Sequence, residues 1–212
     1  MFPRPEFVSR LSADLRHDLL AFLPELILCG IIVTMLLVRL ATRLSRAHLV
    51  VFALFASAAA LVTAVSEWPA AGSSRGLIPE AGGAPGFSGL LVFDLFGLYV
   101  RAFLLLFLCL SLWLSLVTGI PDRDDSADYT TLLVGGTLGM MLMVSASHLL
   151  TLFLAVEMAS VPSYALAGFL KGRRQGSEAA LKYVVYGASA AGIMLYGISL
   201  ITGAYGTGSF PA

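Results

Sequence analysis

Long, uninterrupted apolar segments are the feature that most constrains this chain. A helix that crosses the roughly 30 Å hydrocarbon layer of a membrane needs about 20 mostly apolar residues, because each residue adds about 1.5 Å. Six segments qualify, near residues 20–40, 49–65, 90–117, 129–146, 149–170 and 179–205. The sequence therefore predicts an all-α membrane protein in which residues 1–212 form a single domain of about six transmembrane helices.

The composition excludes several other classes of protein. Only 12% of the residues are charged, 58% are hydrophobic and the mean hydropathy is +0.89, whereas about a quarter of the residues of a soluble protein are charged. The net charge is zero and no block of Lys and Arg occurs, so nucleic acid is not an expected partner. The apolar runs are continuous, which argues against the alternating strands of a membrane β-barrel.

The segments between the helices set the expected topology. The first apolar segment is too long for the core of a signal peptide, so we interpret it as a retained helix. Residues 69–89 are rich in Gly, Pro, Ala and Ser and are expected to form an external loop without regular structure. The short segment Ser145–His148 predicts an antiparallel hairpin between the fourth and fifth helices.

The distribution of Lys and Arg predicts the orientation, because cytoplasmic flanks carry more positive residues. One side of the membrane would carry Arg4, Arg10, Arg16 and Arg75, and the other side a larger set: Arg39, Arg43, Arg46, Arg123, Lys171, Arg173 and Arg174. We therefore expect a multi-pass protein with an external N-terminus.

Glu157 is the strongest candidate for a functional residue. It lies near the middle of the fifth predicted helix, where a charged side chain costs about 2.5–3.5 kcal/mol on insertion scales and normally faces a bundle interior or a wet cavity. Burial and a nearby cation together allow such a carboxyl to bind and release a proton. The alternative is a neutral glutamic acid that hydrogen-bonds to a neighbouring helix.

Two further residues belong to the same candidate proton path. Pro162 removes one helical hydrogen bond and is expected to kink the helix beside Glu157, although prolines are also common in membrane helices for other reasons. Lys182 lies in the first turns of the sixth helix, where its ammonium group either joins the path through a water chain or simply extends to the membrane interface.

The remaining polar candidates are interpreted mainly as structural. Asp94 and Arg101 share one face of the third helix; Asp94 marks the external boundary, and Arg101 is expected to contact a partner helix or a lipid headgroup. His148 either titrates near neutral pH or caps the external turn. Pro24 and Glu25 suit the first turn of a helix.

No local motif for a cofactor or a metal is present. The cysteines, Cys29 and Cys109, lie in apolar runs without ligand spacing and are expected to act as small packing residues. A phosphate-binding glycine loop, a metal-spaced cluster and a nucleophilic triad are all missing from the sequence. Small residues in the sixth helix favour close packing within a larger membrane assembly.

Several of these segments resemble a known family. The stretch Tyr129–Gly203 resembles subunit N of the proton-pumping NADH-quinone oxidoreductase, respiratory complex I. The matching motifs occupy residues 137–154, 156–168, 178–183 and 197–200, and Leu23-Pro24-Glu25 is similar to the family's opening.

The resemblance implies an antiporter-like fold, a function and a location in the bacterial inner membrane. It implies that Glu157 and Lys182 are the carboxylate and the lysine of a proton path through internal water, and that the other membrane-arm subunits and the lipid bilayer are the partners. No cofactor is expected in this chain, because NADH, flavin, iron-sulfur clusters and quinone belong to the assembled complex. Family members have about fourteen helices in two inverted repeats, so the chain is expected to be truncated before the second half.

Two rival functions remain open at this stage. A subunit of a multi-subunit sodium/proton antiporter would share the glutamate of the fifth helix, although Ala180–Tyr183 favours subunit N. A non-conducting structural scaffold is the second rival, because the second half of the family's fold is not present in the sequence.

Overall fold

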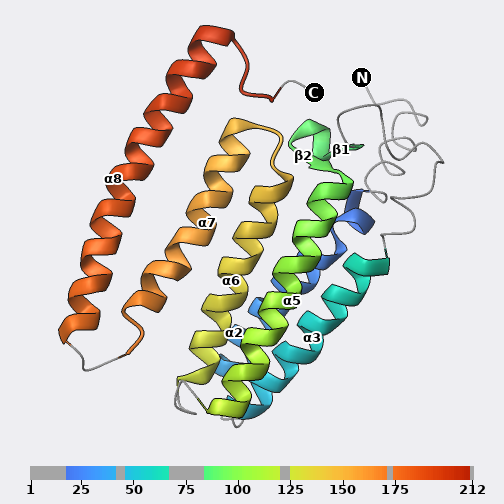
Figure 1. Ribbon diagram of the computed structural model, residues 1–212, viewed down its shortest axis with the longest axis vertical. Helices are drawn as coiled ribbons and strands as arrows, with labels where there is room; N and C mark the ends of the chain where they lie inside the picture. The colour runs from blue at the N-terminus through green and yellow to red at the C-terminus, as the bar shows by residue number, and fades with distance from the viewer. Residues whose placement is uncertain (1–17, 42–45, 67–83, 120–124, 171–173, 211–212) are drawn as a thin grey trace.

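The computed structural model is a bundle of long helices with a small β-hairpin at one end (Figure 1). It describes residues 18–41, 46–66, 84–119, 125–170 and 174–210. The long helices are α2 (Leu23–Ala41), α3 (Arg46–Ser66), α5 (Leu95–Thr118), α6 (Ser126–Ser145), α7 (Leu149–Ala167) and α8 (Arg174–Tyr205). All six contain a stretch long and apolar enough to cross a membrane, so the prediction of a six-helix membrane protein is confirmed.

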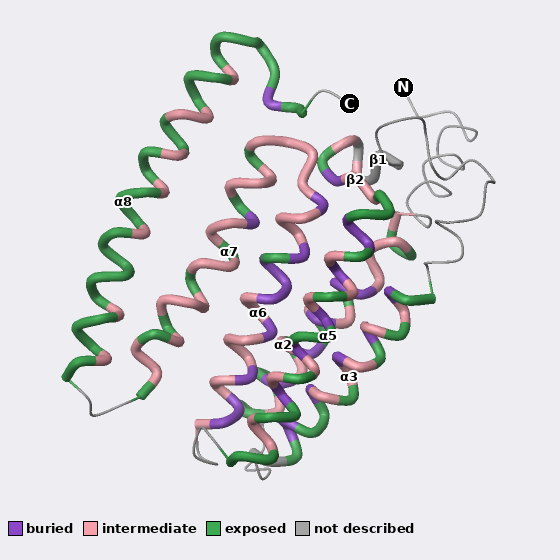
Figure 2. Tube along the Cα trace, viewed as in Figure 1, coloured by how far each residue is buried: buried purple, intermediate pink, exposed green. Residues whose placement is uncertain are grey.

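Four of these helices, α2, α3, α5 and α6, enclose the hydrophobic core. Figure 2 shows that buried positions concentrate on these helices, whereas most of α7 and α8 is half-buried or exposed. The largest fully buried side chains in the core include Leu28, Ile31, Met35, Leu105, Leu108, Leu112, Leu138 and Met141. We call these four helices the body of the protein, and α7 with α8 its flank.

The helix boundaries follow from local capping. At the start of α5, Oδ1 of Asp94 accepts a hydrogen bond from the backbone N–H of Gly97 at 2.7 Å, which is the usual role of an N-cap carboxylate. At its end, Gly119 adopts a left-handed conformation with φ 67° and its N–H donates to the carbonyl of Ser115. Glycine suits this position because it has no Cβ.

The prediction for residues 84–94 was wrong. The third helix was expected to start near Leu90 and residues 69–89 to have no regular structure, but β1 (Ala84–Gly86) pairs antiparallel with β2 (Leu91–Phe93). A short 3₁₀ turn, η1 (Phe87–Gly89), joins the two strands. Residues 67–83 lie outside the part of the chain that the structure describes.

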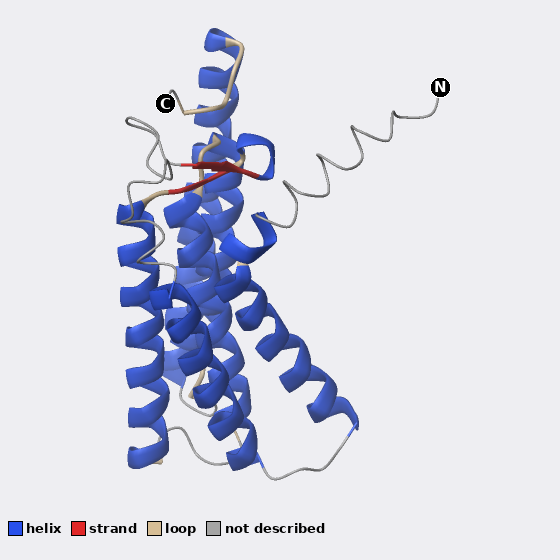
Figure 3. Cartoon of the chain, turned by 90° about the vertical axis from the view of Figure 1, so that its right-hand side faces the viewer, coloured by secondary structure: helices blue, strands red, loops and turns tan. Residues whose placement is uncertain are grey.

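Tertiary contacts hold this hairpin in place, which explains why the local sequence did not predict it. The backbone N–H of Phe87 donates to Oδ2 of Asp18 at 2.8 Å, and the Phe87 ring packs edge-on against Phe22. The carbonyl of Leu90 accepts a hydrogen bond from Ser147. Figure 3 shows the strand pair across one end of the bundle, which we call the hairpin end.

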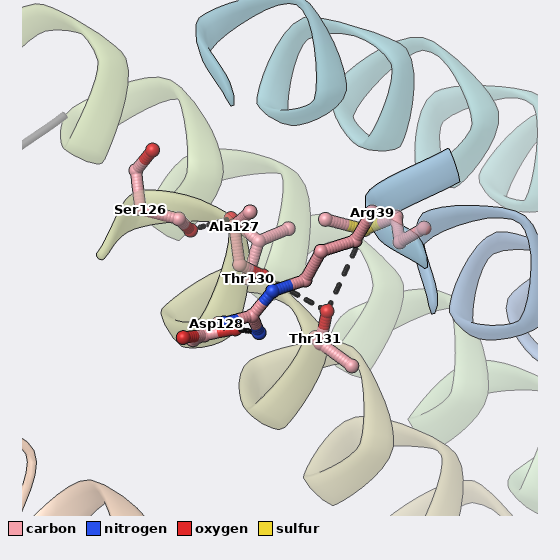
Figure 4. A network of polar contacts seen from close by, with 7 residues as sticks. Arg39, Ser126, Ala127, Asp128, Thr130 and Thr131 are labelled. Atoms are coloured by element: carbon pink, nitrogen blue, oxygen red, sulfur yellow. Dashed lines mark hydrogen bonds and ion pairs between the residues drawn. The ribbon is translucent and has the colours of Figure 1, made fainter. Parts of the chain in front are cut away.

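A second set of polar contacts ties α2 to α6 at the opposite end of the bundle (Figure 4). Arg39, in the last turn of α2, forms an ion pair with Asp128 in the first turn of α6. Next to it, the hydroxyl of Thr131 donates to the carbonyl of Ala127. Arg39 and Asp128 keep about half and a quarter of their side-chain surface exposed, so this contact lies at the edge of the body.

The two cysteines are free and half-buried, as packing residues would be. Sγ of Cys109 lies 3.4 Å from the hydroxyl of Ser57, across the contact between α5 and α3.

Candidate functional site

Glu157 lies on α7, and the position of α7 is set by a close crossing with α6. A Cβ atom added at Gly139 of α6 would lie only 2.5 Å from the backbone nitrogen of Ala159. Only glycine permits this approach of one backbone to another. Glu157 therefore lies two residues from the point where the flank meets the body.

Pro162 continues the same contact along α7. Cβ atoms added at Gly135 and Gly136 would lie 3.6 and 3.8 Å from the Pro162 ring. Pro162 is inside α7, and the helix continues beyond it to Ala167. The Pro162 ring thus packs against the two glycines of α6. The kink expected from the sequence stays a prediction.

The Glu157 side chain is half-buried within this chain. It makes no hydrogen bond and no ion pair with any described residue, and of the residues of α7 only Ala155 is fully buried. The body alone therefore does not enclose this carboxyl group.

Lys182 lies on α8, where it is exposed and does not meet Glu157. Its Nζ lies 2.6 Å from Oε1 of Glu178, one turn earlier on the same helix, and about three-fifths of both side chains is exposed. The structure therefore does not bring the two predicted proton-path residues into direct contact, and the water chain between them stays a prediction.

Small residues and tyrosines hold α8 against α7. The rings of Tyr164 and Tyr183 pack edge-to-face with centroids 4.7 Å apart, and the hydroxyls of Ser163 and Tyr183 lie 3.3 Å apart. The Tyr164 hydroxyl occupies the space where Gly187 would carry a Cβ. No described residue of α8 is fully buried, so this interface leaves Lys182 exposed.

His148 caps α7 rather than facing a cavity. Its Nδ1 accepts a hydrogen bond from the backbone N–H of Leu150 at 3.1 Å, so the ring proton of the neutral form lies on Nε2. The backbone N–H of Leu149 donates to the carbonyl of Gly208 at 2.7 Å, and that of Phe210 donates to the carbonyl of Ser147. The capping alternative from the sequence therefore describes this histidine.

Arg101 and Glu25 form a buried ion pair that the sequence analysis missed. Nη2 of Arg101 lies 2.7 Å from Oε1 of Glu25, and the two side chains are only 3% and 0% exposed. Arg101 was expected to contact a partner helix or a lipid headgroup, and its partner is α2. Glu25 was interpreted only as a residue that suits a helix start, because nothing local indicates that α2 and α5 place these two charges together.

Asp94 has the role expected of it, since it marks the helix boundary through the N-cap described above. Among the described residues, no group of three or more His, Cys, Asp or Glu side chains could hold a metal ion.

The chain is similar to known subunits of respiratory complexes. Residues 146–212 match the family model described as "NADH:quinone oxidoreductase/Mrp antiporter, TM". NADH-quinone oxidoreductase subunit N of Rhizorhabdus wittichii is 39% identical over 69% of this chain and 31% of the relative. Subunit N 1 of Koribacter versatilis is 34% identical over 91% of this chain and 37% of the relative. The chain thus spans about a third of the length of these relatives.

Solved structures agree with the sequence matches. A chain of respiratory complex I from Thermus thermophilus with bound aureothin superimposes with a TM-score of 0.68 and 28% identity, over 89% of this chain and 38% of that chain. The membrane-bound sulfane sulfur reductase, an archaeal respiratory membrane complex, matches with a TM-score of 0.65 and 22% identity, over 90% of this chain and 38% of that chain. The second match supports the fold alone.

Proposed function

We propose that this chain, which belongs to the family of NADH-quinone oxidoreductase subunit N, forms part of the membrane arm of such a complex and takes part in proton translocation coupled to quinone reduction. The support is that relatives named NADH-quinone oxidoreductase subunit N align with 69% and 91% of this chain. The redox reaction and its cofactors would belong to other subunits, because we assign only proton transfer to this chain.

Glu157 is the residue that carries the proposal. It is an ionisable group in a membrane helix, half-buried, without a hydrogen bond or an ion pair among the described residues. Such groups are costly in a membrane and are usually retained for ion or proton transfer. The adjacent crossing at Gly139 fixes the backbone of α7 against the body, so the carboxyl is presented from a rigid support.

Lys182 would be a second group that binds and releases protons on the proton path. Its ammonium group is paired with Glu178, so it can give a proton to that carboxylate and, as a neutral amine, take up another proton from water. Because Lys182 does not contact Glu157, water molecules would have to connect the two groups. Other helices of the membrane arm would pack on the flank, enclose both residues and exclude bulk solvent.

The proposal includes a membrane and an orientation. The chain would lie in the inner membrane of a bacterium with its N-terminus outside, as the distribution of Lys and Arg predicts. An Mrp-type sodium/proton antiporter subunit is the second candidate, because the description of the matching family model names both kinds of protein.

The decisive experiment replaces Glu157 in the assembled complex. Glu157→Gln keeps the size and polarity of the side chain but removes its exchangeable proton, so we expect a several-fold loss of proton pumping in proteoliposomes that oxidise NADH. Asp128→Asn is the matched control, because it makes the same chemical change at the edge of the body and should leave pumping nearly unchanged. Normal pumping by an assembled Glu157→Gln complex would refute the proposed role.

A further inference from the structure

The buried pair of Glu25 and Arg101 lies in the body, away from the candidate path on the flank. We propose that Glu25 is a second proton-binding site, which remains ionised while Arg101 contacts it and takes up a proton when Arg101 moves away. This inference concerns the body of the protein and does not depend on the role proposed for Glu157.

The carboxylate of Glu25 depends on a single charged partner. Both of its oxygens are fully buried, and neither accepts a hydrogen bond of good geometry from a described residue. Its one close polar contact is the 2.7 Å ion pair with Nη2 of Arg101. A buried carboxylate that serves only to hold helices together would be expected to have its remaining lone pairs satisfied.

Arg101 is held by contacts that differ in kind from that ion pair. Its Nη1 donates to the carbonyl of Ala21 over a long 3.4 Å, and its guanidinium lies 4.7 Å above the ring of Phe93 in β2. Both contacts come from the hairpin end, where β2 is linked to the turn between α6 and α7 through Leu91 and Ala146. A shift of the hairpin would therefore change the position of Arg101 relative to Glu25.

Among the described residues, the other titratable groups on the elements around Glu25 supply no second cation beside it. Asp94 uses its Oδ1 to cap α5, and Asp18 accepts a hydrogen bond from Phe87. Cys29 follows one turn along α2 from Glu25, while the charged residue in the described part of α6, Asp128, pairs with Arg39 at the other end of the helix. The described side chains of α3 from residue 48 onward include His48 but no Asp, Glu, Lys or Arg.

The energetics of burial then determine what happens to the carboxyl group. An isolated ionised carboxylate in an apolar interior is so costly that the group neutralises instead. If Arg101 moved away, Glu25 would bind a proton from water and become a neutral carboxylic acid. When Arg101 returned, the O–H bond would break, the electron pair would stay on the carboxylate, and the proton would be released to water.

The depth of the site is comparable with that of Glu157. Arg101 is seven residues from the start of α5 at Asp94, or about 10 Å along the helix, and Glu157 is nine residues from the start of α7 at His148, or about 14 Å. Both helices start at the hairpin end. The two carboxyl groups therefore lie at similar depths, separated by α6, which packs against both α2 and α7.

Infrared spectroscopy of the full chain in lipid nanodiscs tests the proposal. At neutral pH, Arg101→Met should show the carbonyl stretch of a protonated carboxylic acid, and this band should be missing from the double variant Arg101→Met with Glu25→Gln. Arg101→Lys, which keeps a positive charge, should restore the spectrum of the unsubstituted chain. Absence of a Glu25-dependent band in a helical Arg101→Met variant would overturn the proposal.

A second measurement covers the case in which Arg101→Met does not fold. Acid titration of the unsubstituted chain should reveal one carboxylic acid band that Glu25→Gln removes, at a pH where circular dichroism still shows the native helix content. A Glu25 that gains its proton only as the helices unfold would overturn the proposal.

Discussion

The body of this protein buries its ion pair, whereas the flank leaves its ion pair exposed. In the body, Glu25 and Arg101 come from different helices, lie within 2.7 Å of each other and are almost completely buried. In the flank, Glu178 and Lys182 lie one turn apart on the same helix and remain mostly exposed. The distance between the charged atoms is nearly the same in both pairs, so the distance alone does not reveal the function of a pair.

The difference shows which part of the chain provides partners for its own charged groups. The body has a core of its own, and its buried charges find partners within it. The flank presents one half-buried carboxyl and one exposed ion pair on helices that bury very little in this chain. The flank is thus the part of the described chain that leaves its ionisable groups least enclosed.

Breaking the buried pair should give the largest effect on stability. Glu25→Ala would leave the Arg101 guanidinium buried without its counter-charge, and the loss of one partner of a buried pair costs about 3–5 kcal/mol. The measurement is the free energy of unfolding in lipid bicelles. Glu178→Ala is the matched control in the flank, where an exposed pair at this spacing contributes less than about 1 kcal/mol. Equal losses for both variants would contradict the distinction between body and flank.

The contact between body and flank is the next test. Gly139→Ala adds a methyl group that would overlap the backbone of Ala159, and such overpacking costs about 1–3 kcal/mol. Gly192→Ala on α8 is the control, because no atom lies within 4 Å of the added Cβ and alanine favours a helix by about 1 kcal/mol. We expect Gly139→Ala to lower, and Gly192→Ala to preserve or raise, the free energy of unfolding. If Gly139→Ala also preserved or raised the free energy of unfolding, the two helices would cross less closely than the structure indicates.

The smallest effect is expected at the two helix caps. Asp94→Ala removes the carboxylate that caps α5 in the body and should lower the free energy of unfolding by about 1 kcal/mol. His148→Ala removes the weaker, neutral cap of α7 and should cost less. Chemical denaturation of both variants under the same conditions measures the difference, and a larger loss for His148→Ala would reverse the expected order.

The sequence predicted the helices well because hydropathy is a local property. All six predicted helices start and end within five residues of the observed bounds. Helix α5 starts at Leu95 rather than Leu90 because Asp94 caps it and because residues 91–93 pair with β1. The hairpin depends on Asp18, Phe22 and Ser147, which are distant in the sequence.

The candidate functional residues were also identified from their local sequence, which singled out Glu157 but not Glu25. Glu157 stood out because a carboxyl in an apolar helix is costly wherever it occurs. Glu25 did not stand out, because its place after Pro24 already had a simple explanation as a helix start. The one signal in the sequence was that Glu25 and Arg101 carry opposite charges in two predicted membrane helices, but the sequence does not show that these two helices touch.

The sequence by itself determined that this chain spans a membrane with six helices and carries an ionisable group inside one of them, because the cost of placing residues in lipid depends on each short segment alone. Only the tertiary structure decided which charges meet, which helices share a core and which face stays open. Those outcomes depend on how closely two helices can approach, and here glycines such as Gly139 set that distance.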